Sequence, residues 1–213
     1  MTRMPSMPRL LLAAVALLTA AAPNAAEKII RNGEFWKDVA GNPIHSQGGG
    51  MLKVGERYYW YGARYAEAVS YAKAPLAKAD SNHFSAVTAY SSVDLVNWTF
   101  EGDVIKATAP GQVFEPGAWL GRLGVVHHKA TGKYVLVTQY SSKATGAGVL
   151  FATSDTPTGP FVYRHLQAKI ARVATPTSGD QTVFIDDDGQ PYLVFSSGGS
   201  RRHLYVAPLR AAD

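Results

Sequence analysis

Short apolar segments alternate with turns of glycine and polar residues along most of the chain. The same order of an apolar strand, a turn and an aromatic or β-branched strand recurs at residues 51–61, 124–137 and 182–195. Each turn contains a glycine, which accommodates the positive φ angle of a tight turn. The pattern therefore predicts three β-hairpins, and no segment after the first 26 residues shows sustained helical periodicity.

Further strands are predicted after these hairpins. A third strand follows each hairpin, at residues 85–91, 148–153 and 203–207, and a fourth follows the first two, at 98–100 and 160–163. Units of four antiparallel strands, repeated here about 60–75 residues apart, are typical of β-propeller blades. The sequence thus predicts an all-β fold with two complete blades and three strands of another, about 2.75 blades.

The composition of the strands favours a propeller over a β-sandwich or jelly roll. Sandwich strands have one wet face and alternate between apolar and polar residues. The second strands of the hairpins (58–61, 134–137 and 192–195) are apolar on both faces, as a blade between two neighbours requires. The sandwich remains the alternative. Residues 66–83 are rich in alanine and polar side chains and are expected to form a long loop in the first unit.

The first 26 residues have the pattern of a secretory signal peptide. Arg3 and Arg9 supply a positive start, residues 10–22 are an apolar run of 13, and residues 23–26 suit cleavage. An uncleaved membrane anchor is the alternative, but such an anchor needs about 20 apolar residues. We expect a secreted or periplasmic domain over residues 27–213, with no membrane contact after cleavage.

Net charge and amino-acid composition narrow the classes of function that the chain can have. The net charge falls from +5 to +3 without the first 26 residues, which carry two Arg and no acidic residue. The basic residues are scattered apart from Arg201 and Arg202, so no nucleic-acid-binding stripe is predicted. Cysteine is absent, so burial of a core must stabilise the fold. Tyrosine, phenylalanine and tryptophan are plentiful, which favours strands and sugar-stacking surfaces.

Three stretches resemble a known family. They are residues 48–52 with 58–62 (Gly-Gly-Gly-Met-Leu and Tyr-Tyr-Trp-Tyr-Gly), residues 89–98 (Ala-Tyr-Ser-Ser-Val-Asp-Leu-Val-Asn-Trp), and residues 179–193 with Gly-Asp-Gln-Thr-Val-Phe, Asp-Asp-Asp-Gly and Tyr-Leu. In this order they resemble glycoside hydrolase family 43, and the closest branch is that of the exo-β-1,3-galactosidases. The resemblance implies the N-terminal portion of a five-bladed β-propeller with a central pocket, a carbohydrate substrate and inverting hydrolysis.

Inversion needs a carboxylic acid that protonates the leaving oxygen and a base that activates water on the opposite face. The resemblance places Asp180 at the position of the family's Asp that tunes the acid. The alternative is that Asp180 is a turn residue that caps its own backbone.

The family's first-blade Asp has no counterpart, because Gln47 and glycines occupy its place. Gln47 would orient a water or bind a sugar hydroxyl, or it is a plain loop amide. The family's acid would lie in a fourth blade beyond Asp213.

The galactosidase-like branch also has a Glu before an Arg at the start of its second blade. Arg122 matches that Arg and would pair with a carboxylate or a sugar oxygen, with a surface salt bridge as the alternative. Gly121 stands at the position of the Glu. Glu115 is the nearby carboxylate and is therefore the second catalytic candidate. It could reach the pocket if its loop folds inward; the alternative is a solvated loop acid.

Several other side chains are candidates for binding sugar. Trp60 and Trp119 are large enough to stack on a sugar ring, although blade core is the favoured interpretation of Trp60. Gln181 follows Asp180 directly and is a candidate for substrate binding. The glycine run at residues 48–50 indicates close approach of the backbone to a ligand or to the axis, since no Lys or helix follows to make a phosphate loop.

No metal or other cofactor is expected. His127 and His128 are adjacent on a strand, so they point to opposite faces and cannot bind one metal together. Residues 186–189 lack the alternating ligands of a calcium loop and are expected to form a hairpin turn.

Two classes of function remain. One is a glycosidase for a galactan- or arabinogalactan-like plant polysaccharide, or a β-xylosidase or α-L-arabinofuranosidase of the same family. The other is a non-catalytic carbohydrate-binding remnant that keeps the pocket wall without the acid. In either case an open arc of blades would leave an apolar sheet face exposed.

Overall fold

The computed structural model describes residues 29–77, 82–170, 178–197 and 201–210, so the predicted signal peptide lies outside the described residues. The described chain forms three antiparallel sheets, each of consecutive strands. The first sheet contains β1 (Gln47–Val54), β2 (Arg57–Tyr65), β3 (Phe84–Ser92) and β4 (Thr99–Lys106). The second contains β5 (Trp119–His128), β6 (Lys133–Ser142), β7 (Gly146–Ser154) and β8 (Val162–Gln167). The third contains β9 (Ser178–Ile185), β10 (Pro191–Ser197) and β11 (Leu204–Pro208).

These sheets confirm the predicted all-β fold. Every predicted strand lies within or overlaps an observed one, and the observed strands extend further toward the loops. The insertion at residues 66–83, expected to be a loop, contains the short helix α1 (Ala68–Lys73). Six residues are fewer than the window of about 11 in which helical periodicity can be recognised.

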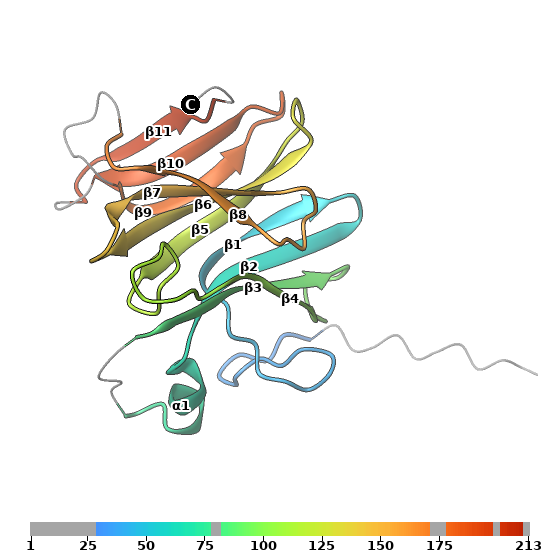
Figure 1. Ribbon diagram of the computed structural model, residues 1–213. Coiled ribbons are helices and arrows are strands. Elements are labelled where there is room, and N and C mark those ends of the chain that lie inside the picture. The colour runs from blue at the N-terminus through green and yellow to red at the C-terminus, as the bar shows by residue number, and fades with distance from the viewer. Residues whose placement is uncertain (1–28, 78–81, 171–177, 198–200, 211–213) are drawn as a thin grey trace, which may run out of the picture.

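The three sheets lie side by side, with their first strands in contact. Strand β1 contacts β5, and β5 contacts β9, while the later strands of each sheet lie further out (Figure 1). This arrangement is that of successive propeller blades around an axis. It brings the starts of β1, β5 and β9 to one end of the molecule.

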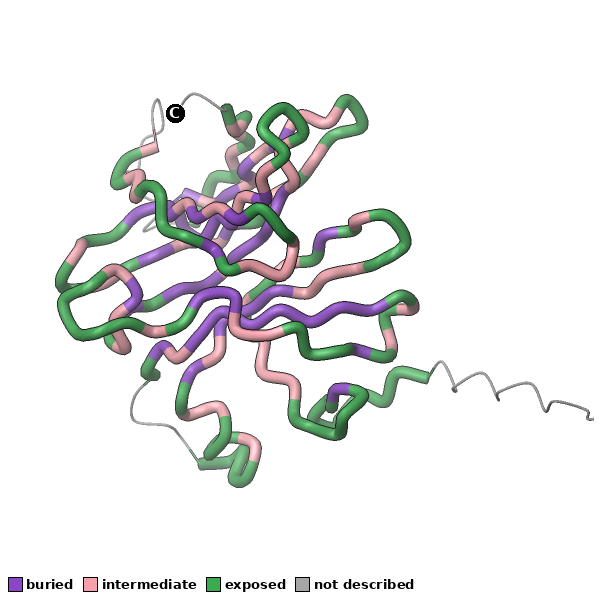
Figure 2. The backbone as a smooth tube through the Cα atoms, turned by 45° about the vertical axis from the view of Figure 1, so that its right-hand side comes forward, coloured by how far each residue is buried: buried purple, intermediate pink, exposed green. Residues whose placement is uncertain are grey.

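The core lies between neighbouring sheets (Figure 2). Tyr61 is fully buried between the first two sheets, and its hydroxyl donates to the carbonyl of Pro157 at 2.7 Å. Tyr65 donates in the same way to the carbonyl of Leu120, also at 2.7 Å. Buried tyrosines of β2 therefore join the first two sheets by both apolar packing and hydrogen bonds.

Glycine is required where the inner strands approach most closely. A Cβ atom on Gly49 would lie 1.6 Å from the carbonyl oxygen of Tyr61. A Cβ on Gly50 would lie 3.0 Å from the carbonyl oxygen of Leu123, on β5 of the next sheet. The glycine run thus permits close backbone approach near the axis, as the sequence indicated.

Both outer faces of this array carry exposed apolar side chains, and on the first sheet these include Met51 and Phe100. Residues 29–46, the N-terminal segment, lie over the first sheet, where Trp36 meets Trp60 edge-to-face with ring centroids 5.9 Å apart. The far face of the third sheet carries exposed apolar side chains, namely Phe184, Leu204 and Val206. An exposed apolar face is the expectation for an open arc of blades. No helix in the described part of the chain is long and apolar enough to cross a membrane.

Candidate functional site

Strands β1 and β5 are bulged at the same end. The pairing of β1 with β2 shifts between Gln47 and Gly50, and that of β5 with β6 shifts between Gly121 and Gly124. Gly48 and Arg122 occupy these bulges with φ angles of +58° and +53°. Bulges often redirect a side chain next to an active site. A positive φ at a residue as large as Arg122 is unusual and marks a strained backbone.

The redirected side chain of Arg122 crosses to the third sheet. Its Nε donates to Oδ1 of Asp180 at 2.8 Å, and Nη1 of Arg201 lies 3.8 Å from the other carboxylate oxygen. A Cβ on Gly48 would lie 3.5 Å from Nη1 of Arg122 and 3.3 Å from its backbone nitrogen. Residues from β1, β5 and β9 therefore meet at one point. The side chains of Arg122 and Asp180 are 41% and 48% exposed, so a ligand can reach the ion pair.

The two arginines determine the charge of Asp180. The hydrogen bond from Arg122, together with the positive charges of Arg122 and Arg201, lowers the pKa of the Asp180 carboxyl below its ordinary value. Asp180 is therefore ionised at neutral pH and is not a proton donor there. The tuning role that the resemblance implies for Asp180 stays a prediction.

Glu115 lies in the loop before β5, and its side chain is hydrogen-bonded to that loop and to the end of β6. Its carboxylate accepts from the backbone nitrogen of Gly111 at 2.8 Å and from the hydroxyl of Ser142. The Ser142 hydrogen bond is the main cause of a lowered pKa for the Glu115 carboxyl. No hydrogen bond or ion pair within the described ranges joins Glu115 to Arg122 or Asp180. A catalytic role for Glu115 remains a prediction, and the contacts show a loop-ordering role.

Trp119 occupies the space beside the second bulge. A Cβ on Gly121 would lie 2.6 Å from Cζ2 of Trp119, so the ring lies across the position where the resemblance places a Glu. Any side chain at residue 121 would displace this ring. Trp119 is partly exposed at the start of β5 and can contact a ligand near Arg122.

Gln181 is more buried than expected of a substrate ligand. It is 8% exposed, and its Oε1 accepts from the hydroxyl of Ser178 at 2.7 Å. Its Nε2 has no hydrogen-bond partner among the residues described. Gln139 on β6 donates to the carbonyl of Ser178 at 2.9 Å, which fixes the start of β9 to the second sheet. Binding of substrate by Gln181 stays a prediction.

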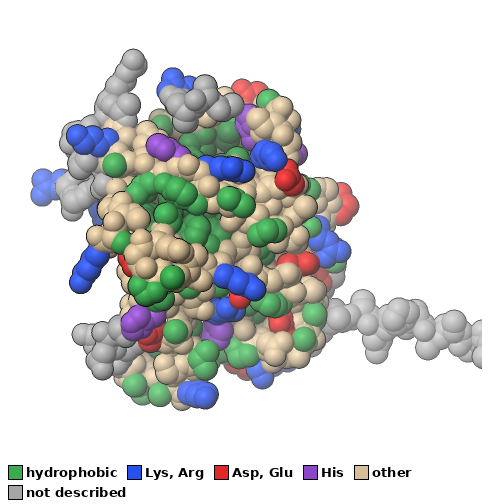
Figure 3. Space-filling model, in the orientation of Figure 1, with side chains coloured by type: hydrophobic (Ala, Val, Ile, Leu, Met, Phe, Trp, Pro, Cys, Tyr) green, Lys and Arg blue, Asp and Glu red, His purple; other side chains and the backbone are tan. Residues whose placement is uncertain are grey.

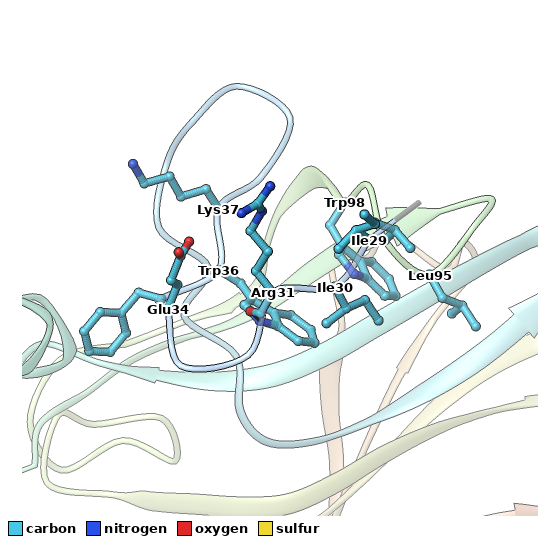
Figure 4. Close-up of a pocket in the computed structure, with 10 residues that line it drawn as sticks. Ile29, Ile30, Arg31, Glu34, Trp36, Lys37, Leu95 and Trp98 are labelled. Carbon is cyan, nitrogen blue, oxygen red and sulfur yellow. Dashed lines mark hydrogen bonds between the residues drawn. The ribbon is translucent and has the colours of Figure 1, made fainter. Parts of the chain in front are cut away.

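Two cavities lie between the N-terminal segment and the first sheet. The larger, of about 440 Å³, has Gln47 and Trp60 in its wall together with Phe35, Trp36 and Tyr71. The smaller, of about 270 Å³, is lined by the apolar side chains of Ile29, Ile30, Leu95 and Trp98 and by the charged side chains of Arg31, Glu34 and Lys37 (Figure 4). Gln47 and Trp60 thus face the larger cavity. Sequence reasoning missed Phe35, Trp36 and Tyr71, for which the only signal was aromatic residues outside the predicted strands.

The surface charge of the visible face agrees with the scattered basic residues of the sequence. Lys and Arg side chains lie dispersed among Asp and Glu on this face and form no continuous stripe (Figure 3). A nucleic-acid partner would require such a stripe.

Comparison with known proteins identifies the family. Residues 41–213 match the model of "Glycosyl hydrolases family 43". The chain belongs to glycosyl hydrolase family 43.

Solved structures of family 43 enzymes share this fold. The exo-β-1,3-galactanase of Clostridium thermocellum is 32% identical with a TM-score of 0.67, over 86% of this chain and 38% of that one. The exo-β-1,3-galactanase of Phanerochaete chrysosporium, solved with β-1,3-galactotriose, is 29% identical with a TM-score of 0.67, over 83% of this chain and 38% of that one. These neighbours confirm the resemblance to the galactosidase-like branch.

A curated relative is named for activity on a different sugar from that of the galactanases. The arabinoxylan arabinofuranohydrolase of Paenibacillus polymyxa is 33% identical over 131 residues, which are 55% of this chain and 20% of the relative. The chain therefore spans about a fifth of this curated relative and well under half of the two galactanase structures.

Proposed function

We propose that this chain supplies the first blades of an inverting glycoside hydrolase that acts on β-1,3-linked galactan or arabinogalactan. The observation that carries the proposal is the Arg122–Asp180 ion pair at the end where the three inner strands meet. The galactanase neighbours, alike over more than four fifths of the chain, support the choice of sugar.

In this mechanism Asp180 orients and tunes rather than reacts. Its ionised carboxylate holds Arg122 through Nε, and among the described residues no hydrogen bond occupies the terminal nitrogens of the guanidinium, so they can donate to a sugar hydroxyl. A negative charge also raises the pKa of a carboxylic acid placed near it, which keeps that acid protonated for transfer to the leaving oxygen. Trp119 provides an aromatic surface beside the same sugar.

The general acid and the general base must be assigned to different groups. The pKa values of Asp180 and Glu115 are both lowered, so neither carboxyl supplies the proton at neutral pH. Glu115 has the protonation state of a base, and Gln47 can orient water through its amide. We propose that the acid lies outside the residues given, as the family resemblance implies.

The proposal is tested with a protein in which this chain is completed by the segment that carries the acid, assayed on nitrophenyl β-galactoside, β-xyloside and α-arabinofuranoside. Cleavage of the galactoside in preference to the others is expected, and NMR of the first product should show an inverted anomeric centre. Preference for the arabinofuranoside would replace the galactan specificity with that of the curated relatives. Retention of configuration would overturn the mechanism.

A non-catalytic carbohydrate-binding protein is the second candidate function. It is favoured by the absence of a protonated carboxyl at the ion pair, combined with exposed aromatic side chains at the same end of the molecule. Folded protein that binds galacto-oligosaccharides without turnover would establish this candidate and would exclude the 213-residue chain itself as an enzyme.

A further inference from the structure

Arg201 is a second arginine at the carboxylate of Asp180. It lies in the connection between β10 and β11, and its Nη1 is 3.8 Å from Oδ2 of Asp180, the oxygen that does not accept from Arg122. A separation of 3.8 Å is too long for a hydrogen bond, so no hydrogen bond to a described residue occupies the guanidinium of Arg201. Its side chain is 64% exposed. The N–H groups of Arg201 can therefore donate to a ligand that approaches Asp180.

The backbone of Arg201 has the same unusual conformation as that of Arg122. Three non-glycine residues in the described part of the chain have positive φ angles, namely Leu95, Arg122 and Arg201. Two of these three are the arginines at Asp180, with φ angles of +53° and +50°. Backbone strain of this kind gathers at ligand sites. The shared strain therefore indicates that the placement of both guanidiniums serves a ligand.

Contacts on β9 and β10 keep Arg201 beside Asp180. The backbone nitrogen of Arg201 donates to the carbonyl of Ser197 at 3.1 Å, and the backbone nitrogen of Ser197 donates to the carbonyl of His203 at 2.8 Å. The aliphatic stem of Arg201 lies next to Gly179, where a Cβ atom would be 3.4 Å from its Cγ. Gly179 directly precedes Asp180 on β9. The position of Arg201 is thus fixed by both strands that meet at this end of the third sheet.

The charges at this point do not balance. Among the described residues, Asp180 is the only acidic residue in an ion pair with Arg122 or Arg201, so two positive charges face one negative charge. A neutral sugar would leave the second positive charge unmatched, whereas a ligand with one carboxylate would match it. The planar guanidinium of arginine binds a carboxylate through two parallel hydrogen bonds. The excess charge and the unoccupied N–H groups of Arg201 therefore favour an anionic ligand.

We propose that this site accepts an acidic sugar, a uronic acid unit whose C6 carboxylate is bound by Arg201 while Arg122 donates to a hydroxyl of the same unit. Galactose and galacturonic acid differ only at C6, so one site can hold both and bind the acidic form more tightly. The inference deepens the proposed function, on which it rests for the carbohydrate nature of the ligand. Arg201 is then the residue that selects acidic over neutral galactan.

The test compares methyl β-galacturonide with methyl β-galactoside, titrated into the full chain and measured by isothermal titration calorimetry and protein NMR. We expect the galacturonide to bind about tenfold more tightly at low ionic strength, and this preference to shrink as salt screens the exposed charges. Substitution R201Q should abolish the preference and leave galactoside binding unchanged. Substitution R201K should give an intermediate preference, because lysine keeps the charge but lacks the planar fork.

The matched control is R164Q. Arg164 lies on β8, where its Nε donates to the hydroxyl of Thr153 at 2.7 Å, and its removal changes the net charge of the chain by the same amount as R201Q. The preference for the galacturonide should persist in R164Q. Equal loss of the preference in R164Q and R201Q would overturn the inference, because the effect would then arise from net charge. Arg201 is largely exposed, so R201Q should fold, which circular dichroism checks.

The outcomes separate this inference from the proposed function. A preference for the galacturonide that is lost in R201Q and kept in R164Q supports the inference even if no sugar is hydrolysed. Hydrolysis of neutral galactosides with no preference for the galacturonide would overturn the inference and leave the proposed function intact. Absence of binding of either glycoside to the folded chain would also overturn it. Tighter binding of galactose 6-sulfate than of the galacturonide would reject the uronic acid in favour of a sulfated sugar.

Discussion

The guanidinium of Arg122 on β5 is bonded to the carboxylate of Asp180 on β9, with Nε and Oδ1 2.8 Å apart, while the backbone of Arg122 holds a φ angle of +53°. A left-handed conformation costs a non-glycine residue of the order of 1 kcal/mol. The ion pair, half exposed, offsets a comparable amount at most. A strained arginine that spans two sheets is therefore better explained by the position it gives the guanidinium than by stability.

The backbone strain at Arg122 is testable by comparing two substitutions. Both R122A and R122G remove the ion pair, but only alanine retains the steric cost of the positive φ. We expect R122G to exceed R122A by about 1 kcal/mol in free energy of unfolding, measured by urea denaturation. Lys133 pairs with Asp155 from an ordinary strand conformation and provides the control. There K133G should be less stable than K133A by about 0.5–1 kcal/mol, and the same order at both positions would contradict the strain.

Substitution D180N separates function from stability. The pair is half exposed, so its loss should change the free energy of unfolding by less than about 1 kcal/mol. Turnover of the aryl glycoside that the protein cleaves should fall at least about a hundredfold, because Arg122 and the acid lose their orienting charge. Substitution D155N removes an exposed ion pair at the opposite end of the second sheet and should leave turnover unchanged. Turnover within about twofold in D180N would remove Asp180 from the site.

Close approach of the inner strands makes Gly49 intolerant of a side chain. In G49A the new Cβ would meet the carbonyl oxygen of Tyr61, a backbone atom that can move only with its strand. We expect a loss of about 3 kcal/mol or more, or failure to fold, measured by thermal and urea unfolding. The control is G117A, where a Cβ would have no atom within 4 Å. Its stability should change by less than about 0.5 kcal/mol.

Acid should destabilise the fold through carboxylates bound in the native state. Asp94 accepts from the backbone and side chain of Asn97 at 2.8 and 2.9 Å, and these bonds strongly lower the pKa of its carboxyl. A lowered pKa means that the unfolded chain binds protons more readily, so stability is present at neutral pH and is lost as pH falls below about 4.

Urea midpoints at pH 7, 5 and 3 measure this loss. Substitution D94N should give a smaller decrease between pH 5 and pH 3 than the unsubstituted protein. Substitution D187N, in an exposed hairpin turn, is the control and should preserve the full decrease. An identical decrease in D94N and the unsubstituted protein would show that Asp94 makes no contribution.

Local features of the fold were predictable because their causes are local. Gly55, Gly132 and Gly189 all have positive φ angles in the hairpin turns where the sequence places them. The strands between the turns were recognisable from short apolar runs, which need no knowledge of distant residues. Helix α1 escaped prediction because one short helix leaves too little periodicity to detect.

The candidate site was predictable only residue by residue. Asp180 and Arg122 were each predicted as site residues, and Arg122 was expected to pair with a carboxylate or a sugar oxygen. The sequence does not indicate that its partner is Asp180, which lies 58 residues further along the chain. The sequence by itself determined the hairpins, the apolar blade faces and the family, because these depend on neighbours in the chain. Only the tertiary structure decided that Arg122 meets Asp180, that Trp119 lies over Gly121, and that Phe35 meets Tyr71. Each of these contacts depends on how separate strands and loops pack around the shared axis, which no local pattern encodes.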